Sequence, residues 1–259
     1  MTTPSRRNAT DRNGHAAIRI EGLCARYGDG PNVLADVDLV LPTGTRLALI
    51  GANGAGKTTL LLHLNGLLQP CSGRVWIDDV EVAPATLGIV RRSVGLVFQD
   101  ADDQLFCPTV FDDVAFGPRH FGTDEAQIEP SVRRALDRVG LRGFDERAPH
   151  RLSAGEKRLA AIASVLSFGP SILALDEPSG QLDPRRRREL IRLLAEIGGT
   201  QVIATHDLDL AWELCDRAAL LADGRIVRDA PARELLADAA LLERHGLELP
   251  LRLQAERRG

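Results

Sequence analysis

The sequence lacks the marks of a membrane-spanning or secreted protein. It contains no run of about 20 apolar residues, the length that a helix needs to cross a bilayer, and its N-terminus has no apolar signal segment. The four cysteines, Cys24, Cys71, Cys107 and Cys215, form no C-x-x-C pair, so neither a zinc site nor a redox motif is predicted. We therefore expect free thiols in a cytosolic chain.

A basic excess is also missing from the 259 residues. The 32 Lys and Arg are outnumbered by 36 Asp and Glu, which gives a formal net charge of −4. Domains that hold nucleic acid by neutralising phosphates are strongly basic, so nucleic acid is not an expected partner. With 44% hydrophobic residues, the chain has the composition of a globular protein, and we expect one lobed domain.

Lysine is almost absent, which draws attention to the two that are present, Lys57 and Lys157. Lys57 lies in Gly-Ala-Asn-Gly-Ala-Gly-Lys-Thr, residues 51–58, which fits G-x-x-x-x-G-K-[ST] without a mismatch. The apolar run 45–50 predicts a buried strand before this motif, and residues 57–68 predict a helix after it. Strand, loop and helix in that order predict a P-loop; a glycine turn that only caps a helix is the alternative.

The chemistry of this loop predicts ATP binding. Its glycines allow backbone amides to approach phosphate oxygens closely, and the N-terminus of the following helix adds partial positive charge. Lys57 can reach the β and γ phosphates, and the Thr58 hydroxyl can ligate Mg²⁺ beside them. We therefore expect ATP and Mg²⁺ as cofactors.

Polar side chains follow two further apolar runs. Residues 171–178 predict a buried strand that ends in Asp176 and Glu177. Asp176 can hold Mg²⁺, directly or through water, and Glu177 can orient or deprotonate an attacking water; a solvated acidic strand end is the alternative. Residues 201–205 predict another strand, which delivers His206 to the carboxyl edge of the sheet, where parallel sheets bind ligands.

Residues 152–156, Leu-Ser-Ala-Gly-Glu, predict the start of a helix. Ser153 and Glu156 have the spacing of a capping box, and an apolar stripe at helical spacing follows from Leu159. A capped helix N-terminus offers free amides and partial positive charge to a phosphate. Capping without any contact to ATP is the alternative.

The motifs together resemble the ABC ATPase family over residues 17–225. Residues 152–156 look like the signature sequence of that family, with Ala154 in place of the commonest Gly and Glu156 in place of Gln. The other matching residues outside the P-loop are Gln99, Asp176, Glu177, Asp183 and His206.

The resemblance implies a head-to-tail dimer with a second ABC ATPase chain, expected to be a homodimer. Two ATP molecules would lie between the P-loop of one chain and the signature of the other. The implied catalytic residues are Glu177, His206 and Gln99. The implied Mg²⁺ residues are Thr58, Gln99 and Asp176. The implied ATP-binding residues are Tyr27, Gly51, Ala52, Asn53, Gly54, Ala55, Gly56, Lys57, Thr58 and Thr59. The implied signature residues acting in trans are Ser153, Ala154, Gly155 and Glu156, and Asp183 is implied to couple the two chains.

Tyr27 is implied to stack on adenine, although a strand-end surface aromatic is the alternative. It is the single Tyr of the chain.

Residues 98–106, 109–118 and 65–68 resemble the ATPases of energy-coupling-factor importers. The resemblance implies a groove near Gln99 that receives a helix of a transmembrane scaffold subunit, a second, substrate-binding membrane subunit, and a place at the cytoplasmic face of the membrane. Residues 152–157 and 242–250 look most like the cobalt or nickel branch. A vitamin importer, such as one for biotin, and a soluble non-transport ABC ATPase are the alternatives, and a P-loop kinase is disfavoured by the signature and His206.

Alternating strand and helix signals predict an α/β fold with a sheet flanked by helices. The resemblance implies that this is the P-loop ABC ATPase fold, with a parallel core sheet, an antiparallel β subdomain near the N-terminus and a helical signature subdomain. We expect a flexible tail over residues 1–16, an ATPase domain over 17–225 with the helical subdomain at about 100–165, and a C-terminal strand and helical tail over 226–259. The Asp223-Gly224 pair predicts a tight hairpin.

Overall fold

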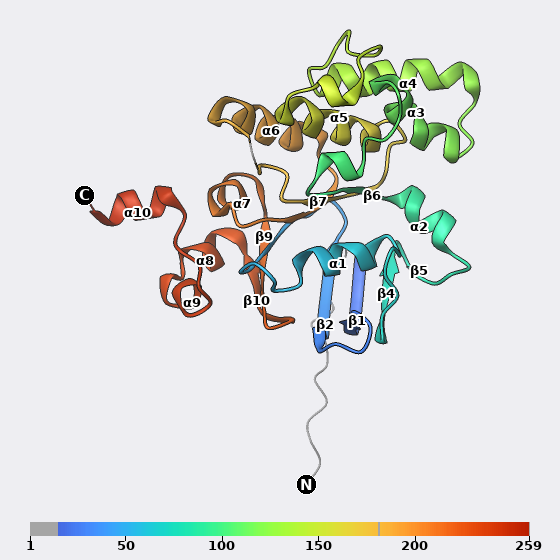
Figure 1. Cartoon of the computed structure of the whole chain (residues 1–259). Helices are drawn as coiled ribbons and strands as arrows, with labels where there is room; N and C mark the ends of the chain where they lie inside the picture. The colour runs from blue at the N-terminus through green and yellow to red at the C-terminus, as the bar shows by residue number, and fades with distance from the viewer. Residues whose placement is uncertain (1–14, 181, 259) are drawn as a thin grey trace.

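The computed structural model describes residues 15–180 and 182–258 of the chain, as an α/β fold with two sheets (Figure 1). The core sheet has six strands in the order β10-β9-β3-β8-β7-β6, all parallel except the edge strand β10. Its strands are β3 (Arg46–Ile50), β6 (Val94–Val97), β7 (Ile172–Asp176), β8 (Thr200–Ala204), β9 (Arg217–Ala222) and β10 (Arg225–Pro231). The predicted parallel core sheet is confirmed.

The parallel strands are apolar on both faces because helices or strands cover each side. Alternate residues of β3 belong to two different clusters: Ala48 and Ile50 join one, and Leu47 and Leu49 join the other. The first cluster is shared with helices, and the second with the antiparallel sheet. The strand that leads into the P-loop therefore has no solvent face.

The antiparallel sheet has the strand order β2-β1-β4-β5 and is the predicted antiparallel subdomain. Its strands are β1 (Ala16–Arg26), β2 (Asn32–Pro42), β4 (Ser72–Ile77) and β5 (Val80–Glu81). Strand β1 begins at Ala16, which is the last residue of the predicted tail. Residues 1–14 of the predicted tail lie outside the described residues.

Helix α1 (Lys57–Leu64) follows the P-loop and lies against both sheets. Its Leu60, Leu61 and Leu64 are buried in the cluster that the two sheets share. The predicted helical segment 57–68 was too long, because the helix ends at Leu64. Gly66, two residues later, takes a left-handed φ of 68° that ends the helical path.

Figure 1 shows helices α3, α4 and α5 at the end of the molecule opposite to β1 and β2. They fall in the range for which the sequence predicts a helical subdomain; its standing as a separate subdomain stays a prediction. The helices of the middle of the chain are α2 (Leu87–Ser93), α3 (Val110–His120), α4 (Glu125–Arg138), α5 (Ala154–Leu166), α6 (Pro184–Ile197) and α7 (Leu208–Leu214), with short 3₁₀ turns at Ala101–Asp103 and Pro149–Arg151.

The predicted hairpin is confirmed between β9 and β10, where Asp223 and Gly224 both have positive φ, 49° and 71°. Three helices follow, α8 (Ala232–Ala237), α9 (Ala239–Arg244) and α10 (Leu251–Arg258). The backbone amides of Leu251 and Arg252 donate to the Asp209 carboxylate, so α7 holds the start of α10.

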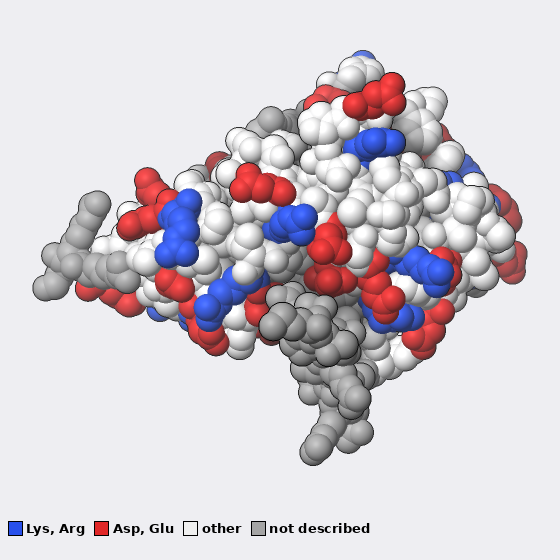
Figure 2. All heavy atoms as spheres, turned by 90° about the horizontal axis from the view of Figure 1, so that it is seen from below, with Lys and Arg blue, Asp and Glu red and all other residues white. Residues whose placement is uncertain are grey.

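Charge is mixed on one face of the molecule. Figure 2 shows Lys and Arg interspersed with Asp and Glu on the face seen from below. No helix within residues 15–180 and 182–258 combines the length and the apolar character that crossing a bilayer requires.

Candidate functional site

The parallel register brings three strand ends to one level. Leu49 pairs with Ala204, and Ala204 pairs in turn with Asp176. The segments that follow β3, β7 and β8 are therefore neighbours at the carboxyl edge of the sheet, as expected for a ligand site in a parallel sheet. A cleft of about 380 Å³ lies there, lined by Val33, Asn53, Gly54, Gly56, Lys57, Thr58, Thr59, Gln99, Asp176, Glu177 and His206.

The P-loop needs glycine at two of its positions because the backbone packs closely. A Cβ on Gly51 would lie 2.2 Å from the Leu221 carbonyl oxygen, and one on Gly56 would lie 2.8 Å from Leu34 Cδ2. Gly56 also has a φ of 104°, a left-handed backbone conformation that residues with a side chain rarely adopt. The loop, which connects β3 to α1, is thereby packed tightly against β9 and β2.

The Lys57 ammonium turns back over the loop. Its Nζ donates to the carbonyl oxygens of Gly51, at 2.8 Å, and Ala52, at 3.2 Å, and lies 3.9 Å from Glu177 Oε1. Burial lowers the pKa of Lys57, and the nearby carboxylates of Glu177 and Asp176 oppose that shift. A lysine held in this way lies within reach of phosphates bound in the loop.

Thr58 and Asp176 contact each other in the lining of the cleft. The Thr58 hydroxyl donates to Asp176 Oδ2 at 2.6 Å. Burial raises the pKa of Asp176, and the hydrogen bond from Thr58 counteracts the shift. A hydroxyl and a carboxylate side by side are the oxygen ligands that Mg²⁺ takes in a nucleotide site, so these two residues fit that ion.

Glu177 lies outside the strand, which corrects the prediction that the strand runs to residue 178. Strand β7 ends at Asp176, and Glu177 has a left-handed φ of 45° while its amide donates to the Ala204 carbonyl. The turn points its buried side chain toward the segment after β8. A non-glycine residue in this conformation is strained and is common at functional sites.

The Glu177 carboxylate is held by the segment that carries His206. Its Oε2 accepts hydrogen bonds from the Thr205 hydroxyl and the His206 amide, both at 3.2 Å, and lies 2.8 Å from His206 Nδ1. The imidazole itself is mostly exposed. The carboxylate is thus fixed on one oxygen, and the other oxygen faces Lys57.

Tyr27 follows β1 and lies beside this cleft. Its hydroxyl is 3.2 Å from the Thr59 hydroxyl in α1, and 53% of the residue is exposed. An exposed aromatic ring next to the P-loop helix is available for stacking on a base. Its role in adenine binding stays a prediction.

Residues of the signature-like segment lie apart from this cleft. Ala154 lines an adjoining cleft of about 470 Å³ together with Thr58, Gln99 and Asp176. Among the described residues, Ser153, Gly155, Glu156 and Asp183 line neither cleft. The predicted capping box is present, with Ser153 and Glu156 bonded to each other and to the backbone. The hydrogen bonds from Ser153 lower the pKa of Glu156.

Asp183 is the N-cap of α6 and directly precedes Pro184. Its Oδ1 accepts from the amides of Arg185, at 2.9 Å, and Arg186, at 3.1 Å, and these bonds lower the pKa of the exposed carboxyl. Its predicted coupling of two chains is not a property of a single chain and stays a prediction.

Arg158 is a residue near the site that the sequence did not predict. It is buried in α5, and its guanidinium donates to the carbonyl oxygens of Phe98, at 2.6 Å, and Gln99. Burial lowers its pKa, while Asp100 and Asp176 raise it. The helix α5 is buried nearly all round, so the stripe that begins at Leu159 gave no sign that a neighbouring arginine is also buried. Arg158 therefore links the backbone of Gln99 to helix α5.

The comparisons with known proteins agree on a family. Residues 34–180 match the family model described as ABC transporter. A protein of Gloeobacter violaceus named as an ABC transporter ATP-binding protein is 51% identical over 90% of this chain and 97% of its own. The energy-coupling factor transporter ATP-binding protein EcfA of Carboxydothermus hydrogenoformans is 44% identical over 91% of this chain and 88% of its own.

Solved structures share the fold. The chain is similar to cbiO1 from Clostridium perfringens, described as part of the ABC transporter complex cbiONQ, with a TM-score of 0.78, 35% identity, and coverage of 89% of this chain and 94% of that one. It is also similar to the ATP-binding cassette MJ0796, solved as a dimer in a post-hydrolysis state bound to ADP and phosphate, with a TM-score of 0.75, 26% identity, and coverage of 83% and 99%.

Proposed function

The chain belongs to the ABC transporter family and is an ATPase that couples ATP hydrolysis to transport, and from this premise we propose that it drives an energy-coupling-factor importer of cobalt or nickel ions. The observation that carries the proposed chemistry is the cleft in which Lys57, the Thr58–Asp176 pair and Glu177 meet. A motor of this kind needs a phosphate cradle, a metal-binding pair and a carboxylate for the water in one place.

ATP would bind with its phosphates in the P-loop, where backbone amides and the Lys57 ammonium stabilise their negative charge. Tyr27 would stack on the adenine, and the hydrogen bond between the Tyr27 and Thr59 hydroxyls would hold the tyrosine ring in place. Thr58 and Asp176 would hold Mg²⁺, with Gln99 as a further ligand. When bound, the ion would neutralise charge on the phosphates.

Hydrolysis would depend on Glu177. Its carboxylate would orient the attacking water and accept its proton, while the water oxygen bonds to the γ phosphorus and the bond to the ADP oxygen breaks. Thr205 and His206 fix one carboxylate oxygen, so the other is left to face the cleft. His206 and Gln99 would contact the γ-phosphate side of the same space.

A second copy of the chain would complete each site. The N-terminus of α5 is capped by Ser153 and Glu156, and with Ala154 and Gly155 it would face the γ phosphate of the partner. Asp183 would couple the two copies. The dimeric form of the similar cassette supports this arrangement.

The helix of the transmembrane scaffold subunit, expected in a groove near Gln99, would lie in a groove of about 310 Å³ that Gln99 itself does not line but its neighbour Phe98 does. The groove is lined mostly by apolar side chains. Two of them, Phe106 and Phe116, are 66% and 51% exposed and stand edge to face with their ring centroids 5.2 Å apart. Large exposed aromatic pairs of this kind are typical of docking surfaces. The motor would thereby sit at the cytoplasmic face of the membrane without crossing it.

Cobalt or nickel as cargo is supported by the likeness of residues 152–157 and 242–250 to that branch of importers. To test it, we would purify the tagged chain from the solubilised membranes of its own cells and identify the partners present in equal amount. A membrane scaffold with a metal-binding membrane protein is the expected result. A vitamin-binding partner would overturn the cargo and keep the motor, whereas the lack of any membrane partner would overturn the importer.

The same preparation tests the groove. The variant Phe116→Asp should release the chain from the membrane partners, because a charge would replace an exposed apolar contact, and should leave the ATPase activity of the free chain unchanged. Val227→Asp is the matched control, since Val227 is an exposed apolar residue on β10. Equal recovery of partners by Phe116→Asp and the native chain would exclude this groove as the docking site.

A further inference from the structure

A part-buried ion pair joins α6 to the segment that carries His206. The Arg187 guanidinium donates twice to the Asp207 carboxylate, from Nε at 2.6 Å and from Nη2 at 2.9 Å. The two side chains are only 23% and 18% exposed. Bidentate pairs of this geometry are strong and directional, so they fix the relative position of the two segments.

Asp207 is also bonded to two other parts of the chain. It accepts from the Ser179 hydroxyl at 3.0 Å and, as the N-cap of α7, from the Leu210 amide at 2.9 Å. Burial alone would raise the pKa of Asp207, but hydrogen bonds from Arg187, Leu210 and Ser179 outweigh it and lower the pKa. The hydrogen bond to Asp207 raises the pKa of Arg187. Both groups are therefore charged at neutral pH.

The same segment holds Glu177. The Asp207 amide donates to the Thr205 hydroxyl oxygen at 2.9 Å, and that hydroxyl donates to Glu177 Oε2. The His206 amide and imidazole contact the same oxygen. A continuous set of hydrogen bonds therefore runs from Arg187 through Asp207 and Thr205 to Glu177.

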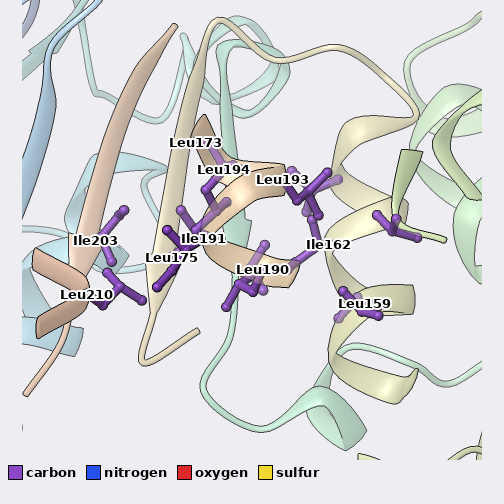
Figure 3. Packing of buried hydrophobic residues seen from close by; sticks show 14 of the residues in the cluster. Leu159, Ile162, Leu173, Leu175, Leu190, Ile191, Leu193, Leu194, Ile203 and Leu210 are labelled. Carbon is purple, nitrogen blue, oxygen red and sulfur yellow. The ribbon is translucent and has the colours of Figure 1, made fainter. Parts of the chain in front are cut away.

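The helix at the other end of this network is firmly packed. Figure 3 shows Leu190, Ile191, Leu193 and Leu194 of α6 between α5 and strand β7. All four are buried, and Asp183 caps the first turn of the same helix. Because α6 is packed on both sides, it holds Arg187, and through it Asp207, in a fixed position.

We infer that Arg187 is a positioning residue for hydrolysis: it clamps Asp207 so that Thr205 and His206 hold the Glu177 carboxylate in its working orientation. This inference rests on the role proposed above for Glu177. Arg187 is not one of the described residues that line the ATP cleft, so it acts through Asp207 and not on ATP.

The first test measures steady-state ATP turnover of the full chain carrying Arg187→Ala or Arg187→Lys. We expect kcat of Arg187→Ala to fall by about 10-fold to 100-fold, since small misplacements of a catalytic group cost that much. KM for ATP and the affinity for a non-hydrolysable ATP analogue should not change. Arg187→Lys keeps the charge and one hydrogen bond and should recover part of kcat. Arg188→Ala, an exposed arginine of the same helix, is the control and should behave as the native chain.

A double-mutant cycle with Asp207→Asn separates positioning from stability. Asn keeps the N-cap of α7 but loses the ion pair. If the two residues act as one clamp, the double variant should lose no more kcat than the worse single variant. All rates are measured well below each melting temperature, so a fall in kcat does not report unfolding.

Three outcomes would overturn the clamp: unchanged kcat in Arg187→Ala, additive losses in the double variant, or a loss that appears in KM instead of kcat. Glu177→Gln serves as the reference. If it loses turnover while Arg187→Ala keeps it, the clamp alone fails; if Glu177→Gln itself turns over normally, the proposed hydrolysis mechanism fails.

Discussion

Replacing Glu177 with Gln should stop ATP turnover and leave ATP binding intact. The side chain is buried, and its Oε2 is the acceptor for Thr205 and the His206 amide. The amide oxygen of Gln can take over both hydrogen bonds, so the fold should not change. The second oxygen becomes an NH₂ group, which cannot accept a proton from water.

The size of the effect follows from the lost base. A positioned general base contributes about 10²-fold to 10⁴-fold in rate. At 1.36 kcal/mol per factor of ten, this corresponds to about 2.7–5.4 kcal/mol in the activation free energy. KM should change little because Lys57 remains held by the Gly51 and Ala52 carbonyls, which the substitution does not touch.

The assay is phosphate release with saturating Mg²⁺ and ATP, together with size-exclusion chromatography in ATP. The variant should accumulate a dimer with ATP bound, because hydrolysis no longer removes the ATP that lies between the two copies. Glu129→Gln, at an exposed acid paired with Arg133 on α4, is the control and should hydrolyse ATP normally. Turnover by Glu177→Gln within a few-fold of the native rate would refute the role of this carboxylate.

Three further predictions follow from the contacts at the site. Gly56→Ala should abolish nucleotide binding and lower the melting temperature, because a left-handed residue with a side chain costs roughly 1–3 kcal/mol in strain and its Cβ would also collide with Leu34. Gly54 has a left-handed φ of 80° too, but a Cβ there meets no atom, so Gly54→Ala should have the smaller effect in calorimetry with ATP. Arg158→Ala should lower kcat and destabilise the fold by about 1–3 kcal/mol, measured by urea unfolding, because two carbonyls lose their donor. Asp207→Asn should lower the free energy of unfolding at neutral pH. Since the folded-state pKa of Asp207 is lowered, the stability that its carboxylate contributes is fully present above the unfolded pKa of about 3.9 and is lost as pH falls through the folded pKa. The unfolding free energies of the native chain and the variant should therefore converge in acid.

The sequence predicted the elements that have strong local signals. The P-loop, the capping box at Ser153 and the hairpin at Asp223 each combine a local residue pattern with a period or a turn, and each lies where expected. These features are set by residues within a few positions of one another, which a single sequence displays.

Features that depend on distant partners were not predicted. Glu177 leaves the strand because its amide bonds to Ala204, a partner that the local apolar run does not reveal. Arg158 and Arg187 look like surface arginines in their helices, and their partners lie 59 and 20 positions away. A buried arginine costs free energy unless it is bonded, so the sites that use one cannot be found without the tertiary arrangement.

The shared packing of the two sheets has a consequence for how the molecule comes apart. Strands β1, β2 and β4, the helix α1 and one face of the core sheet contribute to a single apolar cluster. The antiparallel sheet therefore supports the nucleotide site and is not an independently folding unit. Heating or denaturant should melt it together with the P-loop, and a fragment that lacks it would expose the underside of the core sheet and aggregate.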